Sequence, residues 1–457
     1  MSEFWNGTNW KRAAVYGLGV SGLAASRLLR SRGVEVVGID RRSKQELELD
    51  ELALDTGMDW ILGAEPQDMP EAVDGLVVSP GIDSRDPLVS LARRQEVPVV
   101  SEIELAAPLL NGPVVGITGS NGKSTTSALT GRLLSTSGFE VEVCGNFGVP
   151  LSARVDGEAE RVFVVELSSF QLEYTENLRP RVAAVLNLTA DHLDRHSDLA
   201  SYAAIKESIF SNQAAEDVAV LNADDPIVAA MAVKARRRFF SRKKRVEDGC
   251  YLEGGRVIET TPEGSRKTLF HRDELALRGV HNLENAMVSA LIASSLGAES
   301  SLWSKELASF KGLPHRLEEI ARINGVTWFD DSKGTNIGAT SMSLEGFDDA
   351  TVHLILGGRS KGGKFGNLRG VVEQKVRKAY LIGESADELH RELAGSVDVI
   401  ISGSLENAIA AAHAGARRGE VVLLSPACSS FDQFSSFEER GQQFQRIVAS
   451  LEGRFSG

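Results

Sequence analysis

The residues from Thr118 to Thr125, T-G-S-N-G-K-S-T, have the composition of a loop that holds a phosphate chain. They follow an apolar segment typical of a strand and precede one typical of a helix, so successive backbone amides can surround phosphate oxygens. Lys123 can neutralise the β/γ charge, and Ser124 can coordinate Mg²⁺. Ile117 replaces the first glycine of the general G-x-x-x-x-G-K-[ST] loop, so common kinases and GTPases fit poorly. The predicted contacts to ATP are Gly119, Ser120, Asn121, Gly122, Lys123, Ser124 and Thr125.

Two polar segments follow later apolar runs, E-L-S-S-F at 166–170 and D-H-L-D-R-H at 191–196. Glu166 and His192 could complete the shell of a divalent cation if the fold brings them beside Ser124. Because Mg²⁺ prefers oxygen ligands, a structural role for His192 stays open. Lys206 on the next predicted helix has the pattern of a solvent-exposed lysine.

Asn282 and Asn285 lie three residues apart in H-N-x-x-N, near a predicted helix start. This spacing puts both amides on one helix face, where they could contact a base or ribose, while helix capping is the alternative for Asn282. His315 and Arg316 lie where the last third of the chain begins. Arg316 could meet phosphate charge from a neighbouring domain or form an interdomain salt bridge.

Gly17, Gly19 and Gly22 form G-x-G-x-x-G after an apolar segment, and Asp40 ends the next one. The glycines would let a pyrophosphate approach a helix N-terminus, as in a nicotinamide dehydrogenase, or would simply allow tight strand-to-helix packing. Arg41 and Arg42 are candidate phosphate or ribose contacts, although an exposed basic pair is the commoner meaning.

The chain has 457 residues, enough for about three domains. Its 50 basic and 63 acidic residues give a net charge of -13, so binding to nucleic acid or an anionic membrane is not expected. The basic run at 236–245 is interpreted as a solvated hairpin or loop. Cys144, Cys250 and Cys428 are widely spaced, which indicates reduced thiols. We expect a cytoplasmic protein without a cleaved signal peptide or membrane span.

Short β-branched runs alternate with helix-compatible segments, the pattern of α/β folds with parallel sheets. We predict three successive open α/β units at 1–101, 102–311 and 312–457, with an antiparallel excursion at 251–271. The polar motifs fall at strand ends, where such sheets bind ligands. The predicted strands are 13–16, 34–40, 75–79, 98–101, 113–118, 161–166, 181–189, 217–222, 327–331, 351–358, 378–383, 398–402 and 420–425.

Together, G-S-N-G-K-S-T, H-N-x-x-N, G-L-P-H-R, D-S-K-G-T-N and S-P-A-C-S-S-F-D-Q-F resemble motifs of the Mur ligases of peptidoglycan synthesis over nearly the whole chain. The last two resemble the members that add D-glutamate, because Asp331-Ser332-Lys333 stands where other members have D-Y-A-H or a comparable motif. The resemblance implies Rossmann-like N- and C-terminal domains around a central P-loop ATPase. It also implies a monomer that uses ATP, Mg²⁺, UDP-N-acetylmuramoyl-L-alanine and D-glutamate.

The resemblance assigns further residues. Contacts to the nucleotide substrate would come from Val20, Ser21, Asp40, Arg41, Arg42, Gly81 and Asn146. His192 would support the attacking amine or the tetrahedral intermediate. D-Glutamate would meet Lys333, Thr335, Lys361, Ser430, Phe431 and Phe437, although Lys333 could instead order Asp331. ATP would also contact Asn282, Asn285, Arg316 and Asp331. Metal ligation would fall to Ser124, Glu166, His192 and a carbamylated Lys206.

The implied reaction is ATP-dependent amide ligation through an acyl phosphate, with ADP and phosphate released. Lys123, His192, Lys206 and Arg316 are the expected catalytic residues. Three alternatives remain open: a family relative that accepts another amino acid, a dehydrogenase, and a noncatalytic nucleotide-binding regulator.

Overall fold

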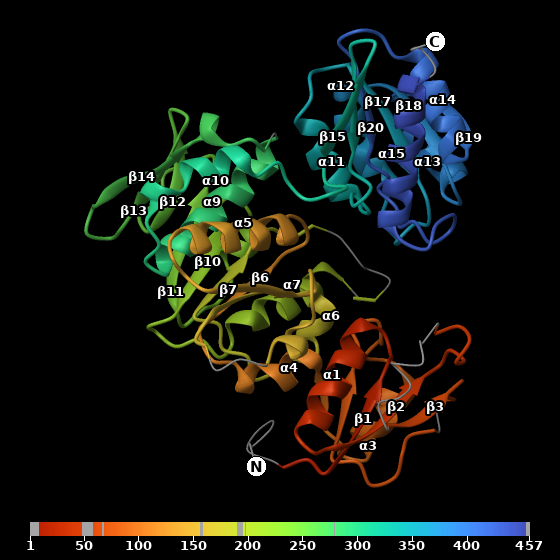
Figure 1. Ribbon diagram of the computed structural model, residues 1–457. Coiled ribbons are helices and arrows are strands. Elements are labelled where there is room, and N and C mark those ends of the chain that lie inside the picture. Colours follow the sequence, from red (N-terminus) through yellow and green to blue (C-terminus); the bar gives the residue numbers. More distant parts are fainter. Residues whose placement is uncertain are drawn as a thin grey trace.

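A computed structural model describes residues 9–47, 58–65, 68–155, 159–189, 195–196, 198–277 and 279–453. Three α/β bodies follow one another along the chain, with the central body in contact with the other two (Figure 1). Within these residues, no helix is both long and apolar enough to cross a bilayer. The three cysteines are free and buried.

The N-terminal sheet has five parallel strands in the order β3-β2-β1-β4-β5. Its other four strand boundaries agree closely with the sequence prediction, whereas β3 was not predicted. The strands are β1 (Arg12–Tyr16), β2 (Glu35–Asp40), β3 (Asp59–Leu62), β4 (Gly75–Val78) and β5 (Val99–Ser101), and the helices are α1 (Val20–Ser31) and α3 (Pro87–Arg94).

The central sheet has nine strands in the order β14-β13-β12-β11-β10-β9-β6-β8-β7, in which β13 runs antiparallel to both of its neighbours, β12 and β14. The predicted antiparallel excursion is therefore confirmed. The strands are β6 (Val114–Thr118), β7 (Val141–Gly145), β8 (Val162–Glu166), β9 (Val182–Val185), β10 (Val218–Asn222), β11 (Arg236–Ser241), β12 (Gly249–Glu253), β13 (Arg256–Thr260) and β14 (Arg266–His271). The helices are α4 (Glu102–Ala106), α5 (Lys123–Thr136), α6 (Ser169–Leu172), α7 (Leu199–Glu207), α8 (Pro226–Ala229), α9 (Val280–Ser295) and α10 (Ser304–Ser309).

The basic run at 236–245 corrects one prediction, because its first part is strand β11 rather than a hairpin or loop. The Arg238 side chain is buried and pairs with Glu259 (2.7 Å) and Asp248 (3.1 Å). From composition alone Arg238 would count as an exposed charge, but Glu259 on β13 and Asp248, just before β12, supply carboxylates that neutralise it.

The C-terminal sheet has six strands in the order β15-β16-β20-β17-β18-β19, with β15 antiparallel at one edge. The strands are β15 (Glu318–Ile323), β16 (Val326–Asp330), β17 (Val352–Gly357), β18 (Val376–Ile382), β19 (Asp398–Gly403) and β20 (Val421–Leu424). The helices are α11 (Ile337–Glu345), α12 (Arg369–Lys375), α13 (Ala386–Leu393), α14 (Leu405–Gly415) and α15 (Phe437–Gly453).

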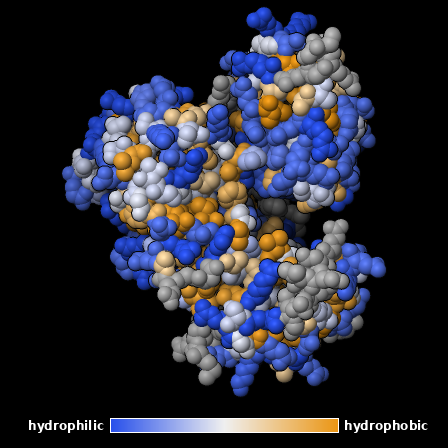
Figure 2. All heavy atoms as spheres, viewed as in Figure 1, coloured by the Kyte–Doolittle hydropathy of each residue, from blue (hydrophilic) through white to orange (hydrophobic). Residues whose placement is uncertain are grey.

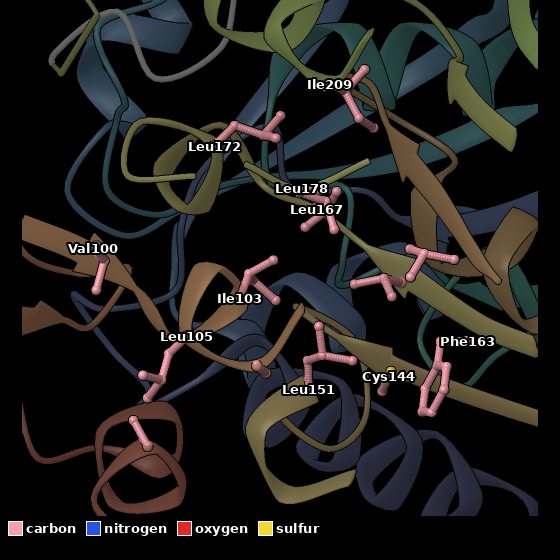
Figure 3. Packing of buried hydrophobic residues seen from close by; sticks show 14 of the residues in the cluster. Val100, Ile103, Leu105, Cys144, Leu151, Phe163, Leu167, Leu172, Leu178 and Ile209 are labelled. Carbon is pink, nitrogen blue, oxygen red and sulfur yellow. The ribbon is translucent and has the colours of Figure 1, made fainter. Parts of the chain in front are cut away.

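Alternating side chains of the central strands pack on opposite faces of their sheet. Val164 joins the core beneath α5 and α9, whereas Phe163 and Val165 join a second core on the other face. That second core continues through Ile103 and Leu105 of α4 to Val100 of β5 in the N-terminal domain (Figure 3). The N-terminal and central domains therefore share one apolar core.

Candidate active site between the central and C-terminal domains

A cavity of about 610 Å³ lies where the strand ends of the central and C-terminal sheets face each other. Apolar surface gathers on the central domain where it meets its neighbours, whereas the outer surfaces are largely hydrophilic (Figure 2). The cavity brings together most of the predicted site. Its lining includes Ser120, Asn121, Gly122, Lys123, Ser124, Thr125, Asn146, Glu166, Lys206, Asn282, Asn285, Arg316, Asp331, Lys333, Thr335, Lys361, Ser430, Phe431 and Phe437.

The predicted phosphate loop joins β6 to α5. Gly122 precedes the helix with a φ of 85°, and a Cβ there would lie 2.3 Å from Asn285 Oδ1, so only glycine fits. Lys123 Nζ lies over the loop and donates to the carbonyls of Gly119 (2.8 Å) and Ser120 (2.9 Å). The helix N-terminus and this ammonium together favour an anion.

Asn187 also shapes this loop, and sequence analysis missed it. Its Oδ1 accepts from the Asn121 amide (2.9 Å), and its Nδ2 donates to the Asn121 carbonyl (3.1 Å). Its place just after β9 is a strand-end signal that could have identified it.

Glu166 ends β8 and turns its buried carboxylate toward the cavity. Oε1 accepts from Asn146 Nδ2 at 2.7 Å, whereas Oε2 has no hydrogen-bond partner within the described part of the chain. A buried carboxylate oxygen without a donor is costly unless a ligand satisfies it. Carboxylate and hydroxyl oxygens such as those of Glu166 and Ser124 suit a hard divalent cation.

Lys206 lies on α7 and is buried, with 1% of its surface exposed, so the expectation of an exposed lysine is wrong. Its Nζ donates to Thr118 Oγ1 (3.1 Å) and to the Gly119 carbonyl (2.9 Å), and lies 4.7 Å from the ring centre of Tyr202. Helix α7 packs under the phosphate loop, and this packing hides a residue whose local sequence looks exposed.

Asn282 and Asn285 are both buried on α9, and Asn285 Nδ2 donates to Asn282 Oδ1 at 3.2 Å. Thr126 Oγ1 on α5 donates to Asn285 Oδ1 at 3.3 Å. The helix N-cap is Gly279 rather than Asn282, so the capping alternative is wrong. The pair instead borders the cavity beside the phosphate loop.

Arg316 crosses from the C-terminal domain to the central domain, where its Nη2 donates to Ser124 Oγ at 2.6 Å. Burial lowers its pKa from the usual value. The flanking residues His315 and Leu317 have φ values of 60° and 49°, a backbone conformation that costs energy outside glycine. Asp330 accepts from His315 Nδ1 (2.7 Å), a contact that holds this turn and raises the histidine pKa.

Asp331 and Lys333 follow β16 on the C-terminal side of the cavity. Burial raises the pKa of Asp331 to about 6, although Ser343 and Ser425 each donate to its Oδ2 at 2.7 Å. Burial, with the nearby Arg316 charge, lowers the pKa of Lys333 to about 8. Its Nζ lies 3.8 Å from the ring centre of Phe437.

The other predicted amino-acid contacts lie close by. Lys361 Nζ donates to Thr335 Oγ1 at 3.1 Å. Ser430 is buried, whereas Phe431 is 63% exposed at the cavity lining. Cations, hydroxyls and an aromatic surface thus converge at one end of the cavity, an arrangement suited to an amino acid with more than one carboxylate.

The predicted nucleotide contacts of the N-terminal domain lie apart from this cavity, around the glycine turn that follows β1. They are Val20, Ser21, Asp40, Arg41, Arg42 and Gly81. Burial tends to raise the Asp40 pKa, but hydrogen bonds from Arg42 and the Leu18 amide outweigh it and lower the pKa. Arg41 pairs with Asp86 at 2.9 Å. His192 lies outside the described residues.

Three family models match successive parts of the chain. They are described as Mur ligase MurD-like N-terminal domain (residues 11–101), Mur ligase middle domain (117–293) and Mur ligase glutamate ligase domain (315–428). A protein of Geotalea uraniireducens is 42% identical, over 97% of this chain and 98% of its own. A protein of Koribacter versatilis is 40% identical, over 96% of this chain and 98% of its own. Both are named UDP-N-acetylmuramoylalanine--D-glutamate ligase.

Solved structures share the fold at lower identity. A pseudomurein peptide ligase type C from Methanothermus fervidus gives a TM-score of 0.61 at 19% identity, covering 96% of this chain and 100% of the other. UDP-N-acetylmuramate-alanine ligase MurC from Thermotoga maritima gives a TM-score of 0.59 at 17% sequence identity, covering 97% of this chain and 100% of the other. The arrangement of three α/β domains is therefore a shared architecture.

Proposed function

The chain belongs to the Mur ligase family, and we propose from this premise that it joins D-glutamate to UDP-N-acetylmuramoyl-L-alanine with hydrolysis of ATP. The product would be a new amide bond, with ADP and phosphate released. The protein would act as a cytoplasmic monomer in peptidoglycan precursor synthesis. This family membership removes the dehydrogenase hypothesis for the first glycine motif.

One observation carries the proposal: a single cavity runs from the phosphate loop to the cations of the C-terminal domain, and Arg316 spans it to reach Ser124 at 2.6 Å. ATP at the loop and an amino acid at Lys333 and Lys361 would then face each other across a short gap. Such proximity replaces a slow encounter between separate molecules with a reaction of held groups.

In the first step, the substrate carboxylate attacks the γ-phosphorus of ATP and forms an acyl phosphate. Both groups are anions, so their approach needs positive charge held in place. Lys123 and Arg316 supply it from opposite sides of the cavity. Asn282, Asn285 and Asp331 would hold the rest of ATP, and Asn146 would contact the nucleotide substrate.

The residues around Ser124 and Glu166 fit Mg²⁺, because the buried Glu166 Oε2 has no donor among the described residues and both side chains offer oxygen. When bound, Mg²⁺ would neutralise phosphate charge. Glu166 and Ser124 would hold the ion. The part assigned to His192 stays a prediction.

We also propose that Lys206 is carbamylated. Only a neutral amine reacts with carbon dioxide, and burial favours the neutral form of lysine. Lys206 is almost fully buried beside Gly119, where the resulting anion would lie close to the phosphate loop. Its negative charge would add an oxygen ligand to the cation site.

In the second step, the D-glutamate amine attacks the acyl carbon, and collapse of the tetrahedral intermediate releases phosphate. Lys333 and Lys361 would bind the two carboxylates, helped by Thr335, Ser430 and the loop through Phe431 to Phe437. Closure of the C-terminal domain over the cavity would exclude water from the acyl phosphate. The proposed domains are 1–101, 102–311 and 312–457, and each contains one of the three sheets.

The test is ADP release by the purified chain with UDP-N-acetylmuramoyl-L-alanine and Mg²⁺-ATP, comparing D-glutamate with L-glutamate and other amino acids. Release that depends on D-glutamate supports the proposal. Preference for another amino acid would indicate a different family activity, and ATP binding without ADP release would indicate a regulator.

A further inference from the structure

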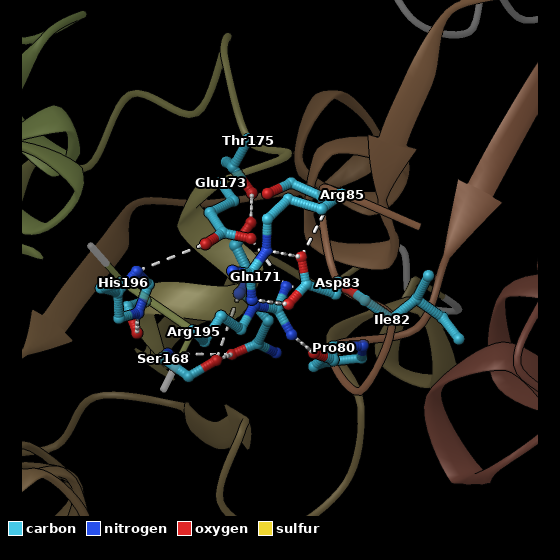
Figure 4. A network of polar contacts seen from close by, with 12 residues as sticks. Pro80, Ile82, Asp83, Arg85, Ser168, Gln171, Glu173, Thr175, Arg195 and His196 are labelled. Atoms are coloured by element: carbon cyan, nitrogen blue, oxygen red, sulfur yellow. Dashed lines mark hydrogen bonds and ion pairs between the residues drawn. The ribbon is translucent and has the colours of Figure 1, made fainter. Parts of the chain in front are cut away.

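Arg195 joins the N-terminal domain to the central domain through four contacts of one guanidinium group. It donates to the carbonyls of Pro80 (3.0 Å) and Ile82 (2.7 Å) and to Glu173 Oε2 (2.6 Å), as Figure 4 shows. It also stacks on Phe170, 4.0 Å from the ring centre. Its side chain is 8% exposed and that of Glu173 is 9%, so this pair is screened little by solvent.

The turn that Arg195 holds belongs to the predicted nucleotide site. Gly81 lies between the two carbonyls that accept from Arg195, and a Cβ there would meet nothing within 4 Å, so its surface is open to a ligand. Ser79 Oγ, at the start of the turn, donates to the carbonyl of Gly17 at 2.6 Å. The turn is thus tied to the glycine motif on one side and to Arg195 on the other.

The other end of this contact chain reaches the cavity. Phe170 lines the cavity. This residue lies on α6, which directly follows β8, the strand that ends at Glu166. Glu173 caps the end of α6. Arg195 therefore connects the N-terminal glycine turn to the element beside the candidate cation site.

We propose that Arg195 is a positioning residue for the nucleotide-sugar substrate. This inference rests on the proposed function. A substrate held at its nucleotide end by the N-terminal domain must present its acid end to the phosphate loop, so the spacing of the two domains sets the reaction distance. The planar guanidinium donates to both carbonyls of the turn while it pairs with Glu173. Lysine keeps the charge but has no fork of this kind.

The decisive experiment is steady-state ADP release by Arg195→Lys, with each of the three substrates varied in turn. The KM for UDP-N-acetylmuramoyl-L-alanine should rise at least about tenfold, as expected for losing a charge-assisted hydrogen bond. The KM values for ATP and D-glutamate should stay within about twofold. Calorimetry should show a matching loss of affinity for the muramoyl nucleotide, with ADP affinity retained.

Arg195→Ala should lose more affinity for the muramoyl nucleotide than Arg195→Lys. Added methylguanidinium should restore part of that affinity. Arg85→Ala is the matched control. Arg85 follows the same turn, but its side chain is 68% exposed and pairs with Asp83 (2.7 Å), so all three KM values should stay at wild-type levels.

An unchanged KM for the muramoyl nucleotide in Arg195→Lys would overturn the inference while leaving the proposed function in place. Equal rises in all three KM values, or failure of both Arg195 variants to fold, would assign Arg195 to general stability and would also overturn it. If the wild-type protein released no ADP with the three substrates, the proposed function itself would fail.

Discussion

Lys123, Lys206 and Arg316 all reach the phosphate side of the cavity, Lys123 and Arg316 as cations and Lys206 as the proposed carbamate, yet each reaches it differently. Lys123 lies in the loop itself, Lys206 comes from beneath on α7, and Arg316 comes from another domain. Their roles can be separated by substitution because their neighbours differ.

Lys123→Ala should lower kcat by a factor of about 10² to 10³, the loss typical of removing one group that stabilises transition-state charge. The fold should survive, because the side chain lies at the cavity lining rather than in the core. ADP release and the thermal unfolding midpoint measure the two effects. Near-normal ligation would remove Lys123 from the mechanism.

Lys206→Ala should lower kcat by a similar factor, since the ligand oxygen and the charge of the proposed carbamate would be lost. A small carboxylate such as formate should restore part of the rate by occupying the vacated space. Rescue by formate but not by chloride would support the carbamate, whereas equal effects of both salts would contradict it.

Lys333 should give D-glutamate binding a pH dependence. A lysine is charged below its pKa, and burial lowers that of Lys333 to about 8, so its attraction for a carboxylate should fade as pH rises through about 8. The KM for D-glutamate should increase over that range, while Lys333→Arg should remove the change. A KM that stays flat up to pH 9 in the wild type would refute this.

Short elements decide where several buried charges lie. Helix α4 carries Glu102, which is 1% exposed, and its Oε2 accepts from the Ser152 amide at 2.9 Å. Oε1 has no partner in the part of the chain that the structure describes. Burial raises the pKa of Glu102 because the charged form is poorly solvated there.

Glu102→Gln should therefore stabilise the protein above pH 4.5 and not below it. In the unfolded chain the Glu102 carboxyl loses its proton near pH 4.5, whereas in the folded chain it keeps the proton to higher pH. The stability of the wild type therefore falls as pH rises from 4.5 toward the folded-state pKa of Glu102. The difference in unfolding midpoint between variant and wild type should grow as pH rises from 4 to 7. A constant difference would mean that Glu102 titrates normally.

At the scale of the whole molecule, the contact between the N-terminal and central domains differs in chemistry from the contact between the central and C-terminal domains. The N-terminal and central domains share an apolar core and the Arg195 contacts, whereas the central and C-terminal domains meet around a polar cavity. Water can fill a polar gap at little cost, but exposing an apolar core is expensive. We therefore expect the C-terminal domain to move when ligands bind or leave.

Distances between spin labels would test this expectation. Cysteines placed at the exposed Gln95, Lys244 and Arg391 can be labelled selectively, because the native cysteines are buried. Adding ATP and the muramoyl nucleotide should change the distance between the labels at positions 244 and 391. The distance between the labels at positions 95 and 244 should stay nearly constant. A larger change in 95–244 would contradict the assignment.

The phosphate loop, the α/β class and the succession of three sheets could be predicted from the chain alone, because they depend on local order. A glycine loop between a strand and a helix, and apolar runs with regular spacing, act over a few neighbouring residues. The subgroup could be recognised from Asp331-Ser332-Lys333 for the same reason, since the motif is contiguous.

Other features depend on packing between distant segments, which sequence spacing does not encode. Lys206 is buried because α7 packs under the loop, Arg238 is neutralised by neighbouring strands, and Asn187 meets Asn121 across two strand ends. Nothing in D-H-L-D-R-H distinguishes Arg195 from a solvent-exposed arginine. Its contacts with the turn at Gly81 exist only in the folded protein. Burial and hydrogen-bond partners arise only when the domains assemble, and these set the charge and position of each side chain.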